Sequence, residues 1–106
     1  MREWKWSPAE KAVARKAFDM ALNGELEAIM REAREMAARI REASELWDLE
    51  RWLGERRCEI DQKYDYRYSV LLPVFGRLVG ERRISVEDLN GLEPEKLAAI
   101  RHWTED

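Results

Sequence analysis

Cysteine, glycine, proline and histidine are all scarce in this chain of 106 residues, which holds one Cys, five Gly, three Pro and one His. The single cysteine, Cys58, excludes a disulfide bond within the chain. So few glycines and prolines leave little material for the many tight turns of an all-β fold. Because zinc sites usually draw on several Cys and His side chains, we expect no metal site and no cofactor.

Several functional signatures are missing as well. The 19 Lys and Arg against 22 Asp and Glu give a net charge of -3, so no overall positive field attracts nucleic acid or anionic lipid. No signal peptide and no run of about 18 apolar residues is visible, which favours a cytoplasmic protein with no membrane partner. No Gly-rich phosphate loop occurs, and no spacing sets His102 beside a nucleophile, which argues against an enzyme.

What the chain does contain is typical of helices: 45% of its residues are hydrophobic and 39% are charged. A capping box, Ser7 with Glu10, and Pro8 at the first helical position predict a helix that runs to about Ala43. It crosses Asn23-Gly24, which we expect the helix to tolerate. Apolar residues then recur at alternating intervals of four and three, as in a heptad seam: Leu22, Leu26, Ile29, Ala33, Met36, Ile40, Ala43 and Trp47.

Such a helix would be roughly 50 Å long at 1.5 Å per residue, which exceeds the span of a small domain. The rest of the chain is too short to cover the whole apolar stripe. A second copy of the chain is the economical cover, so we predict an antiparallel or intertwined homodimer.

A second helix is predicted from Ser44 or Glu45. Its apolar and aromatic face comprises Leu46, Trp47, Leu49, Trp52, Leu53 and Ile60. We expect Cys58 to be a buried packing residue. Glu59 and Lys63 have the spacing of an exposed ion pair on a helix. Together the two helices would form an extended stalk (about 8–62) that carries a small helical head (about 63–103), within a single all-α domain.

Between stalk and head lies an unusual segment, in which Tyr64, Tyr66 and Tyr68 alternate with Asp65 and Arg67. As a strand it would place the three rings on one face, and as a helix it would bring Tyr64 next to Tyr68. With no second strand to pair with, a helix or a tight corner is the better prediction. We expect the rings to be buried, the hydroxyls to reach polar partners, and Asp65 or Arg67 to cap helix ends.

The rest of the head shows further helix boundaries. Pro73 indicates a kink or a helix start, Ser85 with Asp88 forms a capping box, Asn90-Gly91 is a stop, and Pro94 starts a last short helix. Read instead as two helices around a turn, residues 84–103 could contact DNA, with Arg56-Arg57 and Arg82-Arg83 on phosphates. The acidic balance of the chain disfavours this alternative, a small DNA-binding helical dimer.

The stretches GELEAI, LWDLERWLGERRCEIDQKYDYRYSVL and VEDLNGLEPEKLAAI give a more specific clue. Together they resemble the fluorescence recovery protein family of cyanobacteria over nearly the whole chain. That resemblance implies an all-helical homodimer with a stalk and a head, which acts by binding and carries no cofactor. It also implies a partner, the orange carotenoid protein, which quenches the phycobilisome. The family binds the C-terminal domain of its light-activated red form, speeds the return to the orange form and restores fluorescence.

The resemblance carries over to single residues only in part. Trp47 and Arg57 match a tryptophan and an arginine that the family uses at its dimer interface and partner surface. A His-Asp pair of the family is here Glu50-Arg51, which reverses the sign at the acidic position. An aromatic residue and a lysine that contact the partner are replaced by Pro73 and Ala99. The alternative is therefore a homologue with a diverged contact surface and a different protein partner.

These arguments define two sets of candidate site residues. The expected dimer and partner interface comprises Leu26, Ile29, Ala33, Met36, Ile40, Trp47, Glu50, Arg51 and Arg57. The expected hinge between stalk and head comprises Tyr64, Asp65, Tyr66, Arg67, Tyr68 and Phe75.

Overall fold

The computed structural model describes residues 3–104, and within them it contains helices and no strand, so the all-α prediction is confirmed. Two long helices come first and shorter ones follow. In chain order the elements are α1 (Pro8–Ala38), α2 (Ala43–Lys63), α3 (Leu71–Gly80), the 3-10 helix η1 (Val86–Leu89) and α4 (Pro94–Thr104).

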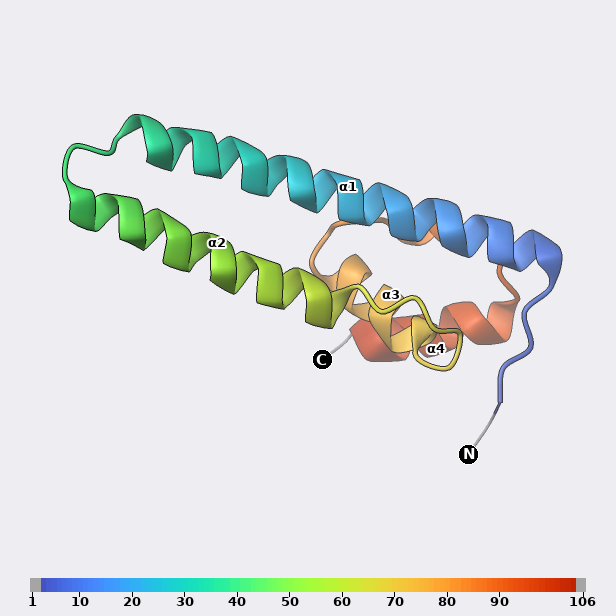
Figure 1. Ribbon diagram of the computed structural model, residues 1–106. Helices are drawn as coiled ribbons and strands as arrows, with labels where there is room; N and C mark the ends of the chain where they lie inside the picture. The colour runs from blue at the N-terminus through green and yellow to red at the C-terminus, as the bar shows by residue number, and fades with distance from the viewer. Residues whose placement is uncertain (1–2, 105–106) are drawn as a thin grey trace.

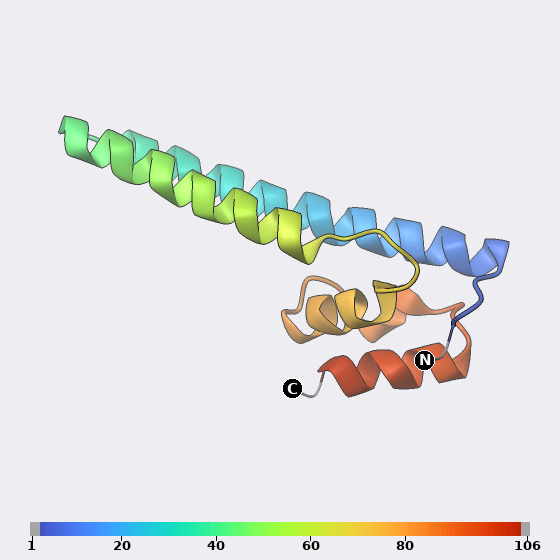
Figure 2. The ribbon, with the colours of Figure 1, turned by 60° about the horizontal axis from the view of Figure 1, so that its bottom comes forward.

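The molecule is elongated, with principal extents of 53 × 25 × 24 Å. Helices α1 and α2 run antiparallel as a long hairpin, which is the stalk (Figure 1). Helices α3 and α4 lie together beside the N-terminal half of α1, while the tip of the hairpin extends well beyond them (Figure 2). This arrangement confirms the prediction of a stalk and a smaller helical head.

The start of α1 is the predicted capping box. The hydroxyl of Ser7 accepts a hydrogen bond from the backbone N–H of Glu10 at 3.1 Å, and the Ser7 N–H donates to the Glu10 carboxylate at 3.1 Å. These two bonds satisfy N–H groups that a helix end leaves without partners. The helix continues through Asn23-Gly24 without interruption, as expected.

The end of α1 corrects the prediction. The helix stops at Ala38 rather than near Ala43, and the chain reverses over residues 39–42. The Glu45 carboxylate organises the reversal, because it accepts hydrogen bonds from the backbone N–H groups of Arg41 and Glu42 at 3.2 and 3.1 Å. The predicted seam therefore breaks: Ile40 lies in the connection, while Ala43 and Trp47 lie on α2.

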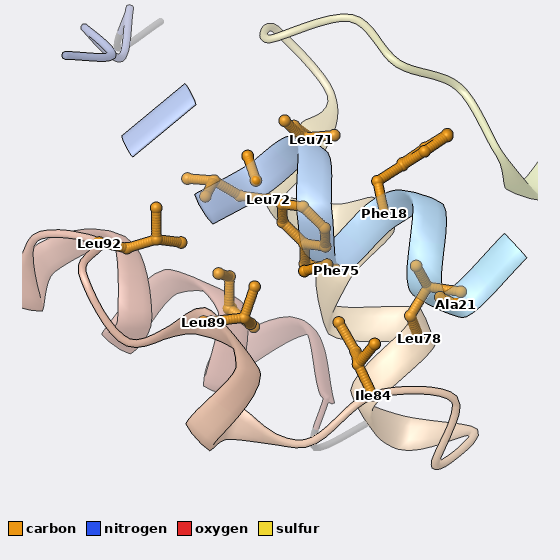
Figure 3. Close-up of a cluster of buried hydrophobic side chains, with 12 residues drawn as sticks. Phe18, Ala21, Leu71, Leu72, Phe75, Leu78, Ile84, Leu89 and Leu92 are labelled. Carbon is orange, nitrogen blue, oxygen red and sulfur yellow. The ribbon is translucent and has the colours of Figure 1, made fainter. Parts of the chain in front are cut away.

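The head encloses a core of buried apolar side chains (Figure 3). Phe75 is fully buried, so this expected hinge residue is a core residue instead. Small residues on α1 let that helix approach the head closely. Burying a large apolar side chain such as that of Phe75 contributes about 1.5–3 kcal/mol to the free energy of unfolding. The core comprises Ala14, Ala17, Phe18 and Ala21 of α1, Leu71, Leu72, Phe75 and Leu78 of α3, and Ile84, Leu89, Leu92 and Ile100 beyond them.

Two glycines shape the head. Gly76 lies where α3 meets α4, and a Cβ atom there would collide with the Cβ of Trp103 and lie 3.0 Å from the carbonyl oxygen of Ile100. Gly91 adopts φ of 112°, a left-handed conformation that glycine tolerates best, and so ends η1 as predicted from Asn90-Gly91. The last helix begins at Pro94, also as predicted.

Among the described residues, no helix combines the length and the apolar character that spanning a membrane requires.

Candidate functional site

The stalk beyond the head has no core of its own. Between residues 26 and 62, no described side chain is buried. Large apolar side chains lie in solvent instead, and Trp47 is 56% exposed. Exposed apolar side chains gathered on one part of a protein are typical of an interaction surface. We call the following residues the exposed stalk residues: Leu26, Met30, Leu46, Trp47 and Leu53.

The residues predicted for the dimer and partner interface all lie on this stalk. Ile29, Ala33, Met36 and Ile40 are half-buried, whereas Leu26 is exposed. On α2, the side chains expected to carry recognition are all exposed, and Arg51 makes an ion pair of 3.2 Å with Asp48. These α2 residues are Trp47, Glu50, Arg51 and Arg57.

Two predictions about α2 are wrong. Cys58 is exposed rather than buried, because it lies on a part of the stalk that nothing in the chain covers. Glu59 does not pair with Lys63. It accepts a hydrogen bond of 2.9 Å from Arg56, while Lys63 is buried at the end of α2 and bonds elsewhere.

Lys63, which is buried, is the centre of a charge cluster that joins stalk to head. Its ammonium group lies 2.9 and 2.8 Å from the two carboxylate oxygens of Glu25 on α1, and 2.7 Å from Glu81 at the end of α3. Tyr64 donates a hydrogen bond of 2.8 Å to Glu25, and Arg83 lies 3.5 Å from the same carboxylate. We call these five residues the joint.

The joint is electrostatically matched. Burial alone would raise the pKa of Glu25, but the bonds from Lys63 and Tyr64 outweigh it and lower that pKa. The pKa of Glu81 is lowered in the same way, with Lys63 and Arg77 outweighing burial. Burial and the neighbouring Glu25 carboxylate raise the pKa of Tyr64. Both glutamates of the joint are therefore held in their charged form.

The turn at the end of α3 positions two of these side chains, Glu81 and Arg83. The N–H of Arg83 bonds to the carbonyl of Leu78 and the N–H of Arg82 to that of Val79, which is a Schellman motif. Arg82 takes the left-handed position with φ of 63°, where glycine is usual. The motif reverses the chain directly after Glu81, so that Glu81 and Arg83 both reach the joint.

A second buried pair ties the start of α1 to α4. The ammonium group of Lys96 lies 2.9 and 2.8 Å from the Glu10 carboxylate oxygens, and the backbone N–H of Glu93 donates to the same carboxylate at 3.0 Å. Burial raises the pKa of Glu10, yet the hydrogen bonds from Lys96, Ser7 and Glu93 prevail and lower it to about 2. Glu10 thus serves the capping box and the pair at once.

Sequence reasoning missed both pairs, although a signal was present. The buried residues of α1 include Glu10, Ala14, Ala17, Ala21 and Glu25, spaced by four, three, four and four. The two glutamates therefore extend the apolar stripe that faces the head, one at each end. A charged residue in phase with a buried stripe calls for a buried partner, because an unpaired buried charge is costly.

The tyrosine segment is the tight corner that was one of the two expected conformations. Each tyrosine ring contacts an aromatic ring of α1 or of the segment before it. The three rings therefore lie on one side of the corner, as alternate residues of an extended chain do. Tyr64 and Tyr66 lie edge-on to Phe18, with ring centres 5.4 and 4.8 Å away, and Tyr68 lies 5.4 Å from Trp6. The rings therefore fasten the corner to α1.

Two details of the corner differ from expectation. The buried hydroxyl of Tyr66 has no hydrogen-bond partner among the described residues, and its burial raises the pKa of Tyr66 to about 12. Asp65 and Arg67 do not cap helices. They pair with each other, with the Arg67 Nε atom 2.8 Å from Asp65 Oδ1, because two residues of separation in an extended chain put both side chains on one side.

The geometry of the described residues offers contact surfaces, the largest along the exposed part of the stalk. Among residues 3–104, no group of three or more His, Cys, Asp or Glu side chains is placed to hold a metal ion. Two arginines considered as phosphate contacts are engaged in ion pairs, Arg56 with Glu59 and Arg83 with Glu25. The first element of the supposed helix-turn-helix, η1, is a 3-10 helix of only four residues.

Comparison with known proteins identifies the family. The family model described as photoprotection regulator fluorescence recovery protein matches residues 6–104. The chain belongs to this family. A curated relative, the fluorescence recovery protein of Synechocystis sp. PCC 6803, is 35% identical over 96 residues, which cover 91% of this chain and 88% of that protein. The resemblance noted in the sequence is confirmed.

Solved structures of the family agree with the fold. The fluorescence recovery protein of Fremyella diplosiphon is 37% identical, with a TM-score of 0.92 over 96% of this chain and 100% of that chain. The protein from Synechocystis sp. PCC 6803 is 33% identical, with the same TM-score and coverage. The match spans both stalk and head. Family membership supports a role as a photoprotection regulator, and the family is not one of known enzymes.

Proposed function

We propose that this chain is a homodimeric regulator that binds the C-terminal domain of the light-activated orange carotenoid protein. Binding would speed the return of that protein to the orange form and so end quenching of the phycobilisome. The observation that carries the proposal is the family match over residues 6–104, joined to a fold that matches the fluorescence recovery protein of Fremyella diplosiphon over 96% of this chain. The protein would act in the cytoplasm, without a cofactor.

The homodimer is supported by the exposed stalk residues. Leu26 and Met30 lie one turn apart on α1, and Leu46 and Leu53 lie two turns apart on α2, so each pair is on one side of its helix. Leaving these side chains in water forfeits the free energy that burial would supply. A second stalk laid along the first, antiparallel or intertwined, would cover both sets at once.

The proposed mechanism is binding alone. A regulator shifts the equilibrium between two states of its partner only if it binds one state more tightly than the other. The stalk presents the groups suited to such contact, because tryptophan and arginine are enriched among residues that dominate binding energy. Trp47 and Arg57, which match the family's interface residues, are both exposed here.

The second candidate function is regulation of a different protein partner by the same scaffold. Four positions favour it: Glu50 and Arg51 on the stalk, and Pro73 and Ala99 on the head. Arg51 stands where the family has an acidic residue, so a partner surface that complements the family would meet the wrong charge.

The dark decay of light-activated orange carotenoid protein tests the proposal. Its absorbance is followed with and without a slight excess of this protein, after light scattering has verified a dimer. We expect this protein to speed the return to the orange form. Arg57→Glu should speed it less than a charge-reversal control at an exposed position of α1, Arg34→Glu. An unchanged rate from a verified dimer would support the second candidate instead.

A further inference from the structure

A groove lies on the head between α1 and η1. Its volume is about 370 Å³, within the range of cavities that bind ligands. None of the described residues that line it belongs to the expected dimer and partner interface, so a ligand there would be bound independently of the proposed function. The lining includes Val13, Lys16 and Met20 of α1, Glu87 and Asp88 of η1, and Asn90.

The core of the head holds the two walls of this groove in place. Leu89 of η1 is fully buried in that core, which fixes η1 against α1. A Cβ atom on Gly91 would lie 2.9 Å from the Cγ2 atom of Val13, so the glycine lets the chain after η1 approach α1 closely. Because the groove is formed in advance, a bound group loses little free energy to ordering it.

The α1 wall of the groove offers apolar surface to solvent. Met20 is 44% exposed, although it lies on the part of α1 that packs against the head. Outside residues 26–62, the exposed large apolar side chains of the described chain are Met20 and Trp103. A group bound in the groove would remove Met20 from water, and the flexible thioether can adapt to its shape.

The η1 wall carries acceptors that the chain leaves unused. The Oδ2 atom of Asp88 accepts hydrogen bonds from the Ser85 N–H at 2.8 Å and from the Ser85 hydroxyl at 3.1 Å. These bonds fix the carboxylate and leave its Oδ1 atom for another donor. Within residues 3–104, the side chains of Glu87 and of Lys16 on the other wall form no hydrogen bond or ion pair. Two carboxylates against one ammonium group give the groove a net negative charge.

We propose that this groove binds an arginine side chain of a protein partner. A guanidinium group presents five N–H donors in one plane, so it can bond to Glu87, Asp88 and the side-chain oxygen of Asn90 together. The methylene groups of the arginine would lie on Met20 and Val13. Lysine brings the same charge on a compact group with three donors, and an acidic side chain would meet two like charges.

A short peptide tests the groove on the full chain by NMR. The probe is acetyl-Gly-Arg-Gly-amide, and its control replaces arginine by citrulline, which has the same shape without the charge. We expect the Met20 methyl and Gly91 amide signals to shift during titration. The indole signals of Trp47 and Trp103, which report on other exposed apolar surfaces, should stay unchanged. The citrulline peptide should bind about threefold more weakly, because ion pairs at exposed sites are modest in strength.

Two variants of the chain should change the affinity in opposite directions. Glu87→Gln removes an acceptor and a negative charge, and should weaken binding of the arginine peptide about threefold. Lys16→Gln removes a like charge, and should strengthen binding about twofold. Neither residue belongs to the core, so both variants should fold as the wild type does. Glu32→Gln, at an exposed position of α1 outside the groove, is the control and should bind like the wild type.

Several results would overturn the proposal. Shifts of the Trp47 or Trp103 indole in place of the Met20 methyl would put the peptide elsewhere. Equal affinity for the citrulline peptide would show that the charge is not recognised. A change of affinity with the same sign in Lys16→Gln and Glu87→Gln would contradict the electrostatic argument, and the absence of any shift at tens of millimolar peptide would show that the groove binds no arginine.

Discussion

The head and the outer stalk, residues 26–62, are stabilised in opposite ways. The head has a complete core, and α1 contributes to it with a stripe of small residues between two buried glutamates. The stalk between residues 26 and 62 buries nothing completely and leaves Trp47 more than half exposed. One chain thus folds its head by itself, while its outer stalk depends on whatever covers it.

The joint lies on the border between these two regions. Lys63 is the last residue of α2 and Glu25 is the last buried residue of α1. Both lie where the exposed part of the stalk meets the buried core of the head. A buried charge pair fixes geometry strictly, because a misplaced partner leaves a charge in an apolar environment. The joint therefore sets the angle at which the head meets the stalk, and with it the relative position of any two contact surfaces on them.

The largest expected effect is on the stalk. Replacing Leu26 and Ile29 together by glutamate would place unpaired charges in the proposed dimer interface, at a cost of several kcal/mol. We expect association to weaken by about a hundredfold or more. The head should stay folded, because its core contains neither residue.

Molar mass by light scattering and tryptophan fluorescence would read these two results separately. The double substitution Glu27→Gln with Glu32→Gln, at exposed positions of the same helix, is the control. An intact dimer of the Leu26 and Ile29 variant would contradict the seam, and an unfolded head would contradict the independence of the two regions.

The next effect concerns the joint. Lys63→Met leaves two carboxylates, Glu25 and Glu81, without their shared cation, and we expect a loss of about 3–5 kcal/mol in the free energy of unfolding. Adding Glu25→Leu should recover much of this loss, because it removes the more deeply buried charge. Urea unfolding at one fixed protein concentration measures both. Equal stability of Lys63→Met and the wild type would show that the cluster does not hold the head.

Acid should weaken the other buried pair. The pKa of Glu10 is about 2 in the folded chain against 4.5 as the ordinary value, so its contribution is complete above pH 4.5 and disappears as the pH falls towards 2. Glu10→Gln should lower the melting temperature at pH 7 and flatten its decline between pH 4.5 and 2.5. Glu32→Gln is the matched control. An unchanged decline in Glu10→Gln would refute the assignment.

Local signals in the sequence predicted local structure well. The Ser7 capping box, the continuity at Asn23-Gly24, the helix start at Pro94 and the corner at the tyrosines each depend on neighbouring residues, and each is confirmed. The stop at Ala38 was missed because residues 39–42 contain neither glycine nor proline, so the apolar period continued across a turn that Glu45 makes.

The contacts between distant segments were beyond that reasoning. Helix α1 carries two apolar stripes, one through Ala14 and Ala21 that the head covers and one through Leu26 and Ile29 that it does not. The predicted seam followed only the second stripe, and periodicity alone does not show which face of α1 the head covers. For the same reason Lys63 read as a surface residue, since its partner Glu25 is 38 positions away.

The smallest effect compares one glycine from each region. Gly76→Ala should cost about 1–3 kcal/mol, because its Cβ meets Trp103 and the Ile100 backbone in a packed contact. Gly24→Ala meets nothing within 4 Å in the single chain and should stabilise α1 by up to about 1 kcal/mol. Thermal unfolding of both variants at equal concentration gives the two signs. If Gly24→Ala instead weakens the dimer, a second chain must approach the backbone of α1 closely at that point. Such a result would extend the proposed interface from the outer stalk to the border of the head.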